Sequence, residues 1–112
     1  MRISALKRVI KSGGGANIGK KENDYFFSLE KETGWDGIFY GKSKKQFILW
    51  EYGYSLDYYE PNKNIVVEYD EPRHYVCGVL KTKDVDRMNI IKTHLKCRFF
   101  RYNEKTGILR EY

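Results

Sequence analysis

The sequence predicts an α+β protein, an α/β arrangement in which a central mixed β-sheet has flanking helices. Residues 20–33 and 83–95 place apolar side chains at the spacing of amphipathic helices, whereas the other stretches are short and rich in strand-forming residues. The order of strand 65–70, helix 83–95 and strand 97–102 is that of a right-handed βαβ unit, whose two strands run parallel. A hairpin before this unit would add antiparallel strands and make the sheet mixed.

The chain of 112 residues has the length of one domain. Residues 1–19 carry four basic side chains and end near a Ser-Gly-Gly-Gly run, which is typical of a flexible connector. We therefore expect a basic N-terminal arm over residues 1–19 and a single domain over residues 20–112. A disordered terminus is the simpler alternative for the arm.

The first helix is predicted from Lys20 to about Thr33, and Gly34 ends it. Residues 37–40 and 45–50 follow as two predicted strands joined through residues 41–44. The sheet is therefore expected to begin with antiparallel strands.

A β-hairpin is predicted next. Residues 51–53 turn the chain into a strand over residues 55–59, Pro-Asn-Lys-Asn at 61–64 is a tight turn, and residues 65–70 form the returning strand. A loop through Gly78 is expected to lead to the second helix. The final segment, residues 105–112, either adds a short strand or frays.

Three carboxylates converge in this hairpin. With residues 62 and 63 at the tip, Asp57 lies opposite Glu68 and diagonal to Asp70, at cross-strand distances of about 5–8 Å. Like charges in such positions destabilise a sheet, so the cluster needs a cation. Mg²⁺ (or Mn²⁺) is the predicted cofactor, because a hard divalent ion takes oxygen ligands from carboxylates and substrate phosphates. The alternative is that these side chains are the solvated polar face of an edge hairpin.

Charged residues after the hairpin extend the candidate site. His74 follows Asp70 by four residues, at a position for a general acid or base beside the metal, or it is an ordinary loop residue. On the second helix, Asp84, Arg87 and Ile91 fall on one face, near the face that packs on the sheet. Asp84 could instead be an N-cap and Arg87 a surface residue.

Composition favours an anionic partner. The net charge of +6 and the pI of about 9.3 suit phosphate binding, and ten tyrosines and two tryptophans offer stacking surfaces. We predict double-stranded DNA as the partner. The expected phosphate contacts are the lysines near the first helix and the first strand turn, namely Lys20, Lys21, Lys42, Lys44 and Lys45.

No run of residues approaches the roughly 20 apolar positions of a membrane span, and the N-terminus lacks a signal-peptide pattern. The two cysteines do not make a disulfide framework. We therefore expect a soluble, intracellular (cytoplasmic) protein with no membrane partner.

The segments LDYYEPNKNIVVEYDEPRHY and KDVDRMNIIKTHLKCRFFRYNE resemble the core of the Vsr-like endonucleases, a branch of the PD-(D/E)XK nuclease superfamily. That branch includes very short patch repair enzymes and phage-type homing endonucleases, and the resemblance covers about residues 20–104. The positions that match its pattern are Asp57, Glu68 with Asp70, His74, Asp84 with Arg87, and Arg101, with Glu22 (or Glu30) as the acidic residue of the first helix.

The resemblance implies a restriction-endonuclease-like core and Mg²⁺-dependent hydrolysis of DNA phosphodiester bonds, of the homing or repair type. It implies catalytic roles for Glu22 and Asp84 besides the hairpin carboxylates, and the host-cell cytoplasm as the location if a phage encodes the chain. One departure matters: Asp70 replaces the Lys of the superfamily's E-x-K motif. Charge stabilisation must then come from His74, Arg87 or Lys83.

Three alternatives stay open. His74 with Cys77 and His94 with Cys97 form two H-x-x-C pairs, a ligand set for a structural tetrahedral Zn²⁺. Glu22 could instead have a purely structural role, because the helix dipole favours a carboxylate in the first turn of helix 20–33. A nucleic-acid-binding module without catalytic activity would account for the basic composition equally well.

Overall fold

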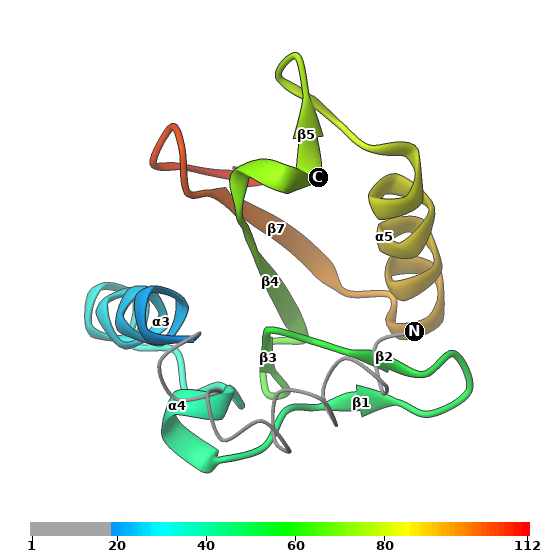
Figure 1. Ribbon diagram of the computed structural model, residues 1–112. Coiled ribbons are helices and arrows are strands. Elements are labelled where there is room, and N and C mark those ends of the chain that lie inside the picture. The colour runs from blue at the N-terminus through cyan, green and yellow to red at the C-terminus, as the bar shows by residue number, and fades with distance from the viewer. Residues whose placement is uncertain (1–18) are drawn as a thin grey trace. The chain divides into compact units, whose positions relative to one another are not determined.

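The computed structural model describes residues 19–112, which fall into two compact units (Figure 1). The N-terminal unit ends at Pro61 and the C-terminal unit is Asn62–Tyr112. All of the predicted basic arm except Gly19 lies outside the described residues. Within residues 19–112, no helix is long and apolar enough to cross a membrane.

The N-terminal unit begins with helix α3, Lys20–Thr33, which has the predicted bounds. Gly34 ends it in the left-handed conformation, with φ of 76°, and its N–H donates to the carbonyl of Glu30. Glycine is the residue that adopts this conformation without steric cost. The helix buries Phe26 and Leu29, in agreement with its amphipathic pattern.

The segment after α3 differs from the prediction. Residues 37–40 are not a strand, and Tyr40–Ser43 forms a single helical turn, α4. The N–H of Gly41 donates to Asn23 Oδ1 at 3.1 Å, and a Cβ at Gly41 would lie 2.7 Å from the Asn23 side chain. This tight packing of α4 against α3 outweighs the strand propensity of the aromatic residues around it.

Short strands complete the N-terminal unit. The predicted strand 45–50 shrinks to β1, Ile48–Leu49, which pairs antiparallel with β2, Tyr54–Ser55. The predicted strand 55–59 is broken, because the chain bends at Asp57 before β3, Tyr58–Glu60.

Aromatic rings form the core of this unit. Phe26, Phe39 and Tyr58 are each fully buried, with ring centroids 5.1–5.6 Å apart. A Cβ on Gly37 would lie 2.3 Å from the Tyr58 ring, so only glycine fits there. Tyr58 therefore ties residues before and after α4 into one core.

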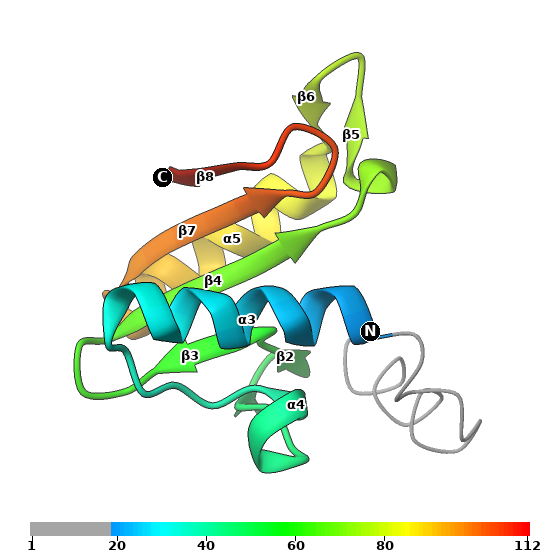
Figure 2. The ribbon, with the colours of Figure 1, turned by 90° about the vertical axis from the view of Figure 1, so that its left-hand side faces the viewer.

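The C-terminal unit confirms the predicted βαβ unit and mixed sheet. Strand β4, Ile65–Asp70, runs parallel to β7, Arg98–Asn103, and helix α5, Thr82–Leu95, connects them. Strand β8, Ile108–Glu111, pairs antiparallel with β7 and corresponds to the short strand expected at the end. Figure 2 shows β4 and β7 pointing the same way, with α5 behind them and β8 reversed.

Strand β4 is buried along its whole length. All six of its residues are buried, as in a strand covered on both faces. Helix α5 buries Asp84, Arg87, Met88 and Ile91, so the two charged residues do lie on its packed face as the sequence predicts.

The expected loop between β4 and α5 is structured. It contains a 3₁₀ turn, η1 (Pro72–His74), and a hairpin of β5 (Tyr75–Val76) and β6 (Val79–Leu80). Cys77 and Gly78 form its two-residue turn, with φ of 51° and 78°. Two consecutive left-handed residues are what the twist of a two-residue hairpin requires.

Candidate functional site

Five charged side chains are buried in the C-terminal unit. Their exposed fractions range from 1% for Asp70 to 9% for Arg87. They come from β4, α5 and β7, and they are Glu68, Asp70, Asp84, Arg87 and Arg101. Burying a charge is costly unless it is paired, so the partners of these groups decide what the cluster can do.

Asp70 is held by two donors. Arg101 binds it with both arms of the guanidinium, Nε to Oδ2 at 2.6 Å and Nη2 to Oδ1 at 2.8 Å. The Tyr75 hydroxyl also donates to Oδ2, at 2.9 Å. Burial and the charge of Asp70 raise the pKa of Tyr75, so this phenol stays protonated. Burial alone would lower the pKa of Arg101. The hydrogen bonds and the charge of Asp70 outweigh burial, so the pKa is raised above its ordinary value.

Glu68 is paired across to the helix. Arg87 Nη1 of α5 donates to Glu68 Oε1, and both side chains are at least nine-tenths buried. Glu68 also faces Arg101 in the parallel register of β4 and β7. The two carboxylates of β4 thus lie between two guanidinium groups.

His74 and Asp84 form the third polar contact. His74 Nδ1 lies 3.2 Å from Asp84 Oδ1, and the side chains are 19% and 11% exposed. Asp84 Oδ2 is buried and has no hydrogen-bond partner within residues 19–112. The structure thus joins six predicted residues of this unit into three pairs: His74 with Asp84, Glu68 with Arg87, and Asp70 with Arg101.

The Mg²⁺ site stays a prediction, and two of the carboxylates predicted to bind the ion already have charged donors. Both oxygens of Asp70 carry charged donors from Arg101, and Glu68 accepts from Arg87. Among residues 19–112, no group of three or more His, Cys, Asp and Glu is placed to hold a metal ion. Two guanidinium groups thus supply positive charge beside Glu68 and Asp70.

The remaining predicted acidic residues belong to the N-terminal unit. Asp57 lies at the bend before β3, and Glu22 lies in the first turn of α3, both half-buried. Their meeting with Glu68 and Asp70 stays a prediction. Glu30, the alternative to Glu22, is engaged in its own unit.

Glu30 is the centre of a hydrogen-bonded cluster. It accepts from the Gly37 N–H at 2.6 Å, from the Tyr58 hydroxyl at 2.7 Å and from Lys42 Nζ at 2.8 Å. Lys42 also pairs with Asp36 at 2.8 Å. Burial would lower the pKa of Lys42, but these carboxylates outweigh burial and raise it. Lys42 thus has two carboxylate partners, and its contact with phosphate stays a prediction.

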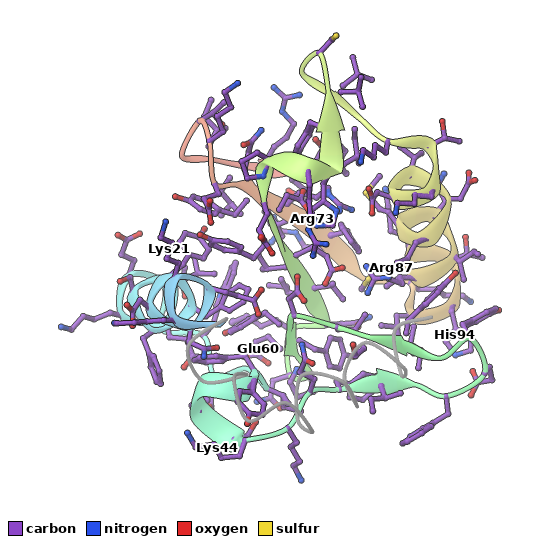
Figure 3. The ribbon with its side chains drawn as sticks, viewed as in Figure 1. Lys21, Lys44, Glu60, Arg73, Arg87 and His94 are labelled. Carbon is purple, nitrogen blue, oxygen red and sulfur yellow. The ribbon has the colours of Figure 1, made fainter. Side chains whose placement is uncertain are left out.

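The other predicted phosphate contacts lie on the surface of the N-terminal unit. Lys20 forms an exposed pair with Asp24 at 2.9 Å, and Lys44 lies over the Tyr40 ring. Lys21 and Lys45 are exposed. Figure 3 labels Lys21 on α3 and Lys44 at the end of α4.

The four-ligand zinc prediction is wrong. His74 contacts Asp84 in the first turn of α5, whereas His94 lies in its last turn (Figure 3). Ten helical residues span about 15 Å, but ligands of one tetrahedral zinc lie within about 4 Å of one another. Cys77 is exposed at the tip of the β5–β6 hairpin, and Cys97 is half-buried just before β7.

Sequence reasoning named Arg101 only through the family resemblance and missed Tyr75. An arginine within the apolar run Phe-Phe-Arg-Tyr is a usable signal, because arginine is rarely buried without a partner. Tyr75 carries no such signal, because the orientation of its side chain depends on the β5–β6 hairpin, which the sequence does not predict. Comparison with protein-family models, with curated proteins and with solved structures found no match to this chain.

Proposed function

We propose that the chain is a DNA endonuclease that hydrolyses phosphodiester bonds, with the reacting groups in the C-terminal unit. The observation that carries this proposal is the set of five buried charged residues around β4. Buried ion pairs add little net stability compared with well-packed apolar side chains of similar size. A small unit that nevertheless concentrates them around one strand has the character of a functional site.

The chemistry of the cluster favours phosphate as the substrate group. Guanidinium groups bind phosphate oxygens in the same forked geometry as carboxylates, so Arg87 and Arg101 suit an anionic transition state. His74 supplies a proton acceptor or donor near neutral pH. The positive net charge and the exposed lysines Lys21, Lys44 and Lys45 suit a DNA backbone.

The positions that resemble the Vsr-like pattern support the same interpretation. Glu68, Asp70, His74, Asp84, Arg87 and Arg101 all lie in the C-terminal unit, and each has a polar contact there. A parallel strand pair joined by a helix suits a restriction-endonuclease-like core. The dependence on Mg²⁺ or Mn²⁺ stays a prediction, and no step of the proposed chemistry is assigned to a metal.

Cleavage of supercoiled plasmid DNA tests the proposal. The full chain is incubated with plasmid in Mg²⁺, in Mn²⁺ and in EDTA, and nicked and linear products are separated on agarose. We expect His74→Ala to lose about 10²–10⁴-fold in rate, the range of general acid–base catalysis. His94→Ala is the matched control, because His94 is exposed at the far end of α5 and should leave the rate unchanged. Wild-type protein that leaves the plasmid intact in all three conditions would refute the endonuclease.

Asp57→Asn tests the part of the proposal that concerns the N-terminal unit. The change preserves shape and removes one charge from a half-buried side chain. If Asp57 acts in the reaction, cleavage should fall by at least about 10²-fold while DNA affinity is nearly kept. Cleavage at the wild-type rate would show that Asp57 has no role in the reaction. The proposed reacting groups would then all belong to the C-terminal unit.

One observation favours a second candidate, a DNA-binding module that does not cut. Both carboxylates of β4 are already satisfied by arginines, an arrangement that a purely structural cluster would also have. Such a module would bind DNA equally well with Mg²⁺ and with EDTA and would leave plasmid intact. A gel-shift titration beside the cleavage assay therefore separates the two candidates.

A further inference from the structure

The β5–β6 hairpin of the C-terminal unit turns an apolar side to solvent. Its register pairs Tyr75 with Leu80 and Val76 with Val79. Directly opposed residues share one side of a hairpin, and successive pairs alternate between its two sides. The Tyr75 hydroxyl donates to Asp70 at 2.9 Å, so the first pair lies on the side toward the sheet. Val76 and Val79 lie on the other side, where they are 57% and 68% exposed.

This pattern is the reverse of the usual one, in which the solvent side of an antiparallel ribbon is polar. The two residues of the turn add no charge, since they are the exposed Cys77 and Gly78. Figure 1 and Figure 2 both show the hairpin projecting beyond the strands and α5 of its unit. Single exposed apolar residues are common, but two opposed valines at an uncharged tip indicate a contact surface.

The hairpin is built onto the candidate site. Tyr75 follows His74 directly, and its N–H donates to the carbonyl of Pro72 in η1. The N–H of Lys81, which follows β6, donates to the carbonyl of His74 at 3.0 Å. Both ends of the hairpin are thus held by backbone hydrogen bonds next to His74. A substrate that reaches His74 therefore lies beside the hairpin.

Basic residues flank the base of the hairpin. Arg73 precedes it in η1 (Figure 3), and its side chain is 75% exposed. Its contact with the exposed Glu71 is 3.6 Å long, and such surface pairs contribute little. Lys81 follows the hairpin and is half-buried. An apolar tip with cations at its base matches a groove of DNA, where base edges lie between two rows of phosphates.

We propose that the β5–β6 hairpin enters the major groove of DNA beside the scissile phosphate, where Val76 and Val79 pack on thymine methyl groups. This inference deepens the proposed function and rests on it. The major groove is about 12 Å wide and admits a two-stranded β-ribbon, whereas the minor groove is about 6 Å wide. Thymine presents an apolar group, its C5 methyl, in the major groove, and apolar side chains contact that group. Arg73 and Lys81 then contact phosphates at the edge of the groove.

Protection of Cys77 locates DNA on the hairpin and needs no cleavage. The chain has two cysteines, so Cys77 is the only thiol of the full-length variant Cys97→Ser. In EDTA, a saturating duplex of alternating adenine and thymine should abolish the fast reaction of this exposed thiol with a disulfide reagent. In Cys77→Ser, the reaction of Cys97 should be the same with and without the duplex.

Two results of this experiment would overturn the proposal. The first is a Cys77 thiol that reacts equally fast with and without saturating DNA. The second is protection without DNA that grows with protein concentration, which would identify a second copy of the chain as the occupant of the apolar side.

Replacing thymine by uracil tests the base contact, because uracil pairs in the same way but lacks the C5 methyl. Fluorescence anisotropy in EDTA should show wild type binding the uracil duplex about 4-fold more weakly for each methyl group lost from the contact. The double variant Val76→Ser, Val79→Ser should bind both duplexes equally. Ile108→Ser is the matched control, since Ile108 is also an exposed apolar residue of a strand in this unit, and it should keep the preference. Equal binding of both duplexes by wild type would overturn the proposal without any variant.

Arg73→Gln tests the charge at the base of the hairpin. Loss of one phosphate contact should reduce the slope of log affinity against log salt by about 0.9 and leave the preference for thymine unchanged. The double valine variant should show the opposite result, with the preference lost and the slope kept. An unchanged slope in Arg73→Gln would refute the contact of Arg73 with phosphate.

The outcomes separate this proposal from the proposed function. If wild type cuts plasmid but shows neither protection of Cys77 nor preference for thymine, the hairpin contact is refuted and the endonuclease stands. If Cys77 is protected and thymine is preferred while plasmid stays intact, the endonuclease fails and the contact of the hairpin with the major groove stands.

Discussion

At the scale of single residues, the C-terminal unit depends on matched charges inside its sheet. Asp70 and Arg101 are 1% and 3% exposed and share two hydrogen bonds. Removing one member of such a pair leaves the other as a buried charge without a counter-charge. This destabilises the fold much more than replacing both members by apolar residues. Stability should therefore respond asymmetrically to single and paired substitutions.

Arg101→Ala is expected to lower the free energy of unfolding by about 3–5 kcal/mol, because Asp70 is left buried with the Tyr75 hydroxyl as its remaining donor in the cluster. Arg110→Ala is the control. Arg110 faces Arg101 in the register of β7 and β8 but is exposed, so its replacement should matter by less than about 0.5 kcal/mol. Urea unfolding followed by circular dichroism measures both. Equal effects would show that the buried pair is not structurally important.

The two cysteines should differ in reactivity. Cys77 is exposed in the hairpin turn, whereas Cys97 is half-buried and burial raises the pKa of its thiol. A raised pKa means a smaller thiolate fraction at any pH below it, and the thiolate is the reactive form. At pH 8, a disulfide reagent should therefore modify one thiol quickly and one slowly. Cys77→Ser should remove the fast phase and Cys97→Ser the slow one; the reverse assignment would contradict the burial argument.

At the scale of elements, the sequence predicts the long ones well. The bounds of α3 and β4 agree with the prediction, and those of α5 and β7 differ by one residue. Each of these elements is long enough to display several repeats of its own apolar period. Local pattern is therefore sufficient to identify them.

The short elements depend on contacts that the sequence does not reveal. Tyr40–Ser43 has strand-forming neighbours, but the bond from Gly41 to Asn23 of α3 makes it a helical turn. The β5–β6 hairpin needs a non-glycine residue, Cys77, in the left-handed conformation, which residue type does not predict. The carboxylates of β4 were identified from sequence, but their arginine partners depend on the register of the parallel pair and on α5.

Glu30 shows how one helix organises its unit. Its carboxylate accepts from the backbone of Gly37 and from the side chains of Tyr58 and Lys42. Glu30→Ala should lower the free energy of unfolding by about 1.5–3 kcal/mol, the range for hydrogen bonds to a charged group. Glu32→Ala, an exposed change on the same helix, should cost less than about 0.5 kcal/mol. Thermal unfolding compares the two variants. Indistinguishable midpoints would show that Glu30 does not stabilise the unit.

At the scale of the whole molecule, the predicted tasks are divided between the two units. The exposed lysines proposed to bind phosphate belong to the N-terminal unit, and the buried charged cluster belongs to the C-terminal unit. Binding and cleavage should then be separable by mutation.

Replacing Lys21, Lys44 and Lys45 together by alanine should weaken DNA binding and reduce the slope of log affinity against log salt by about 0.9 for each phosphate that the variant no longer neutralises. Lys42→Ala should instead destabilise the fold, because its partners are Glu30 and Asp36. Lys105→Ala, an exposed change in the C-terminal unit, is the control for charge. Fluorescence anisotropy at several salt concentrations measures the slope. An unchanged slope in the triple variant would place the DNA elsewhere on the chain.

The parallel pairing of β4 with β7 also governs how the protein is made. Ile65 faces Arg98, so β4 leaves the ribosome with all of α5 still to be synthesised before its partner exists. Until then, the apolar run of β4 carries unpaired backbone groups along that edge, and such an edge is a template for aggregation. The parallel pair also forms slowly during folding, because the long connection between its strands must be ordered first. A chain terminated within α5 should therefore accumulate as insoluble material, with no partly active fragment.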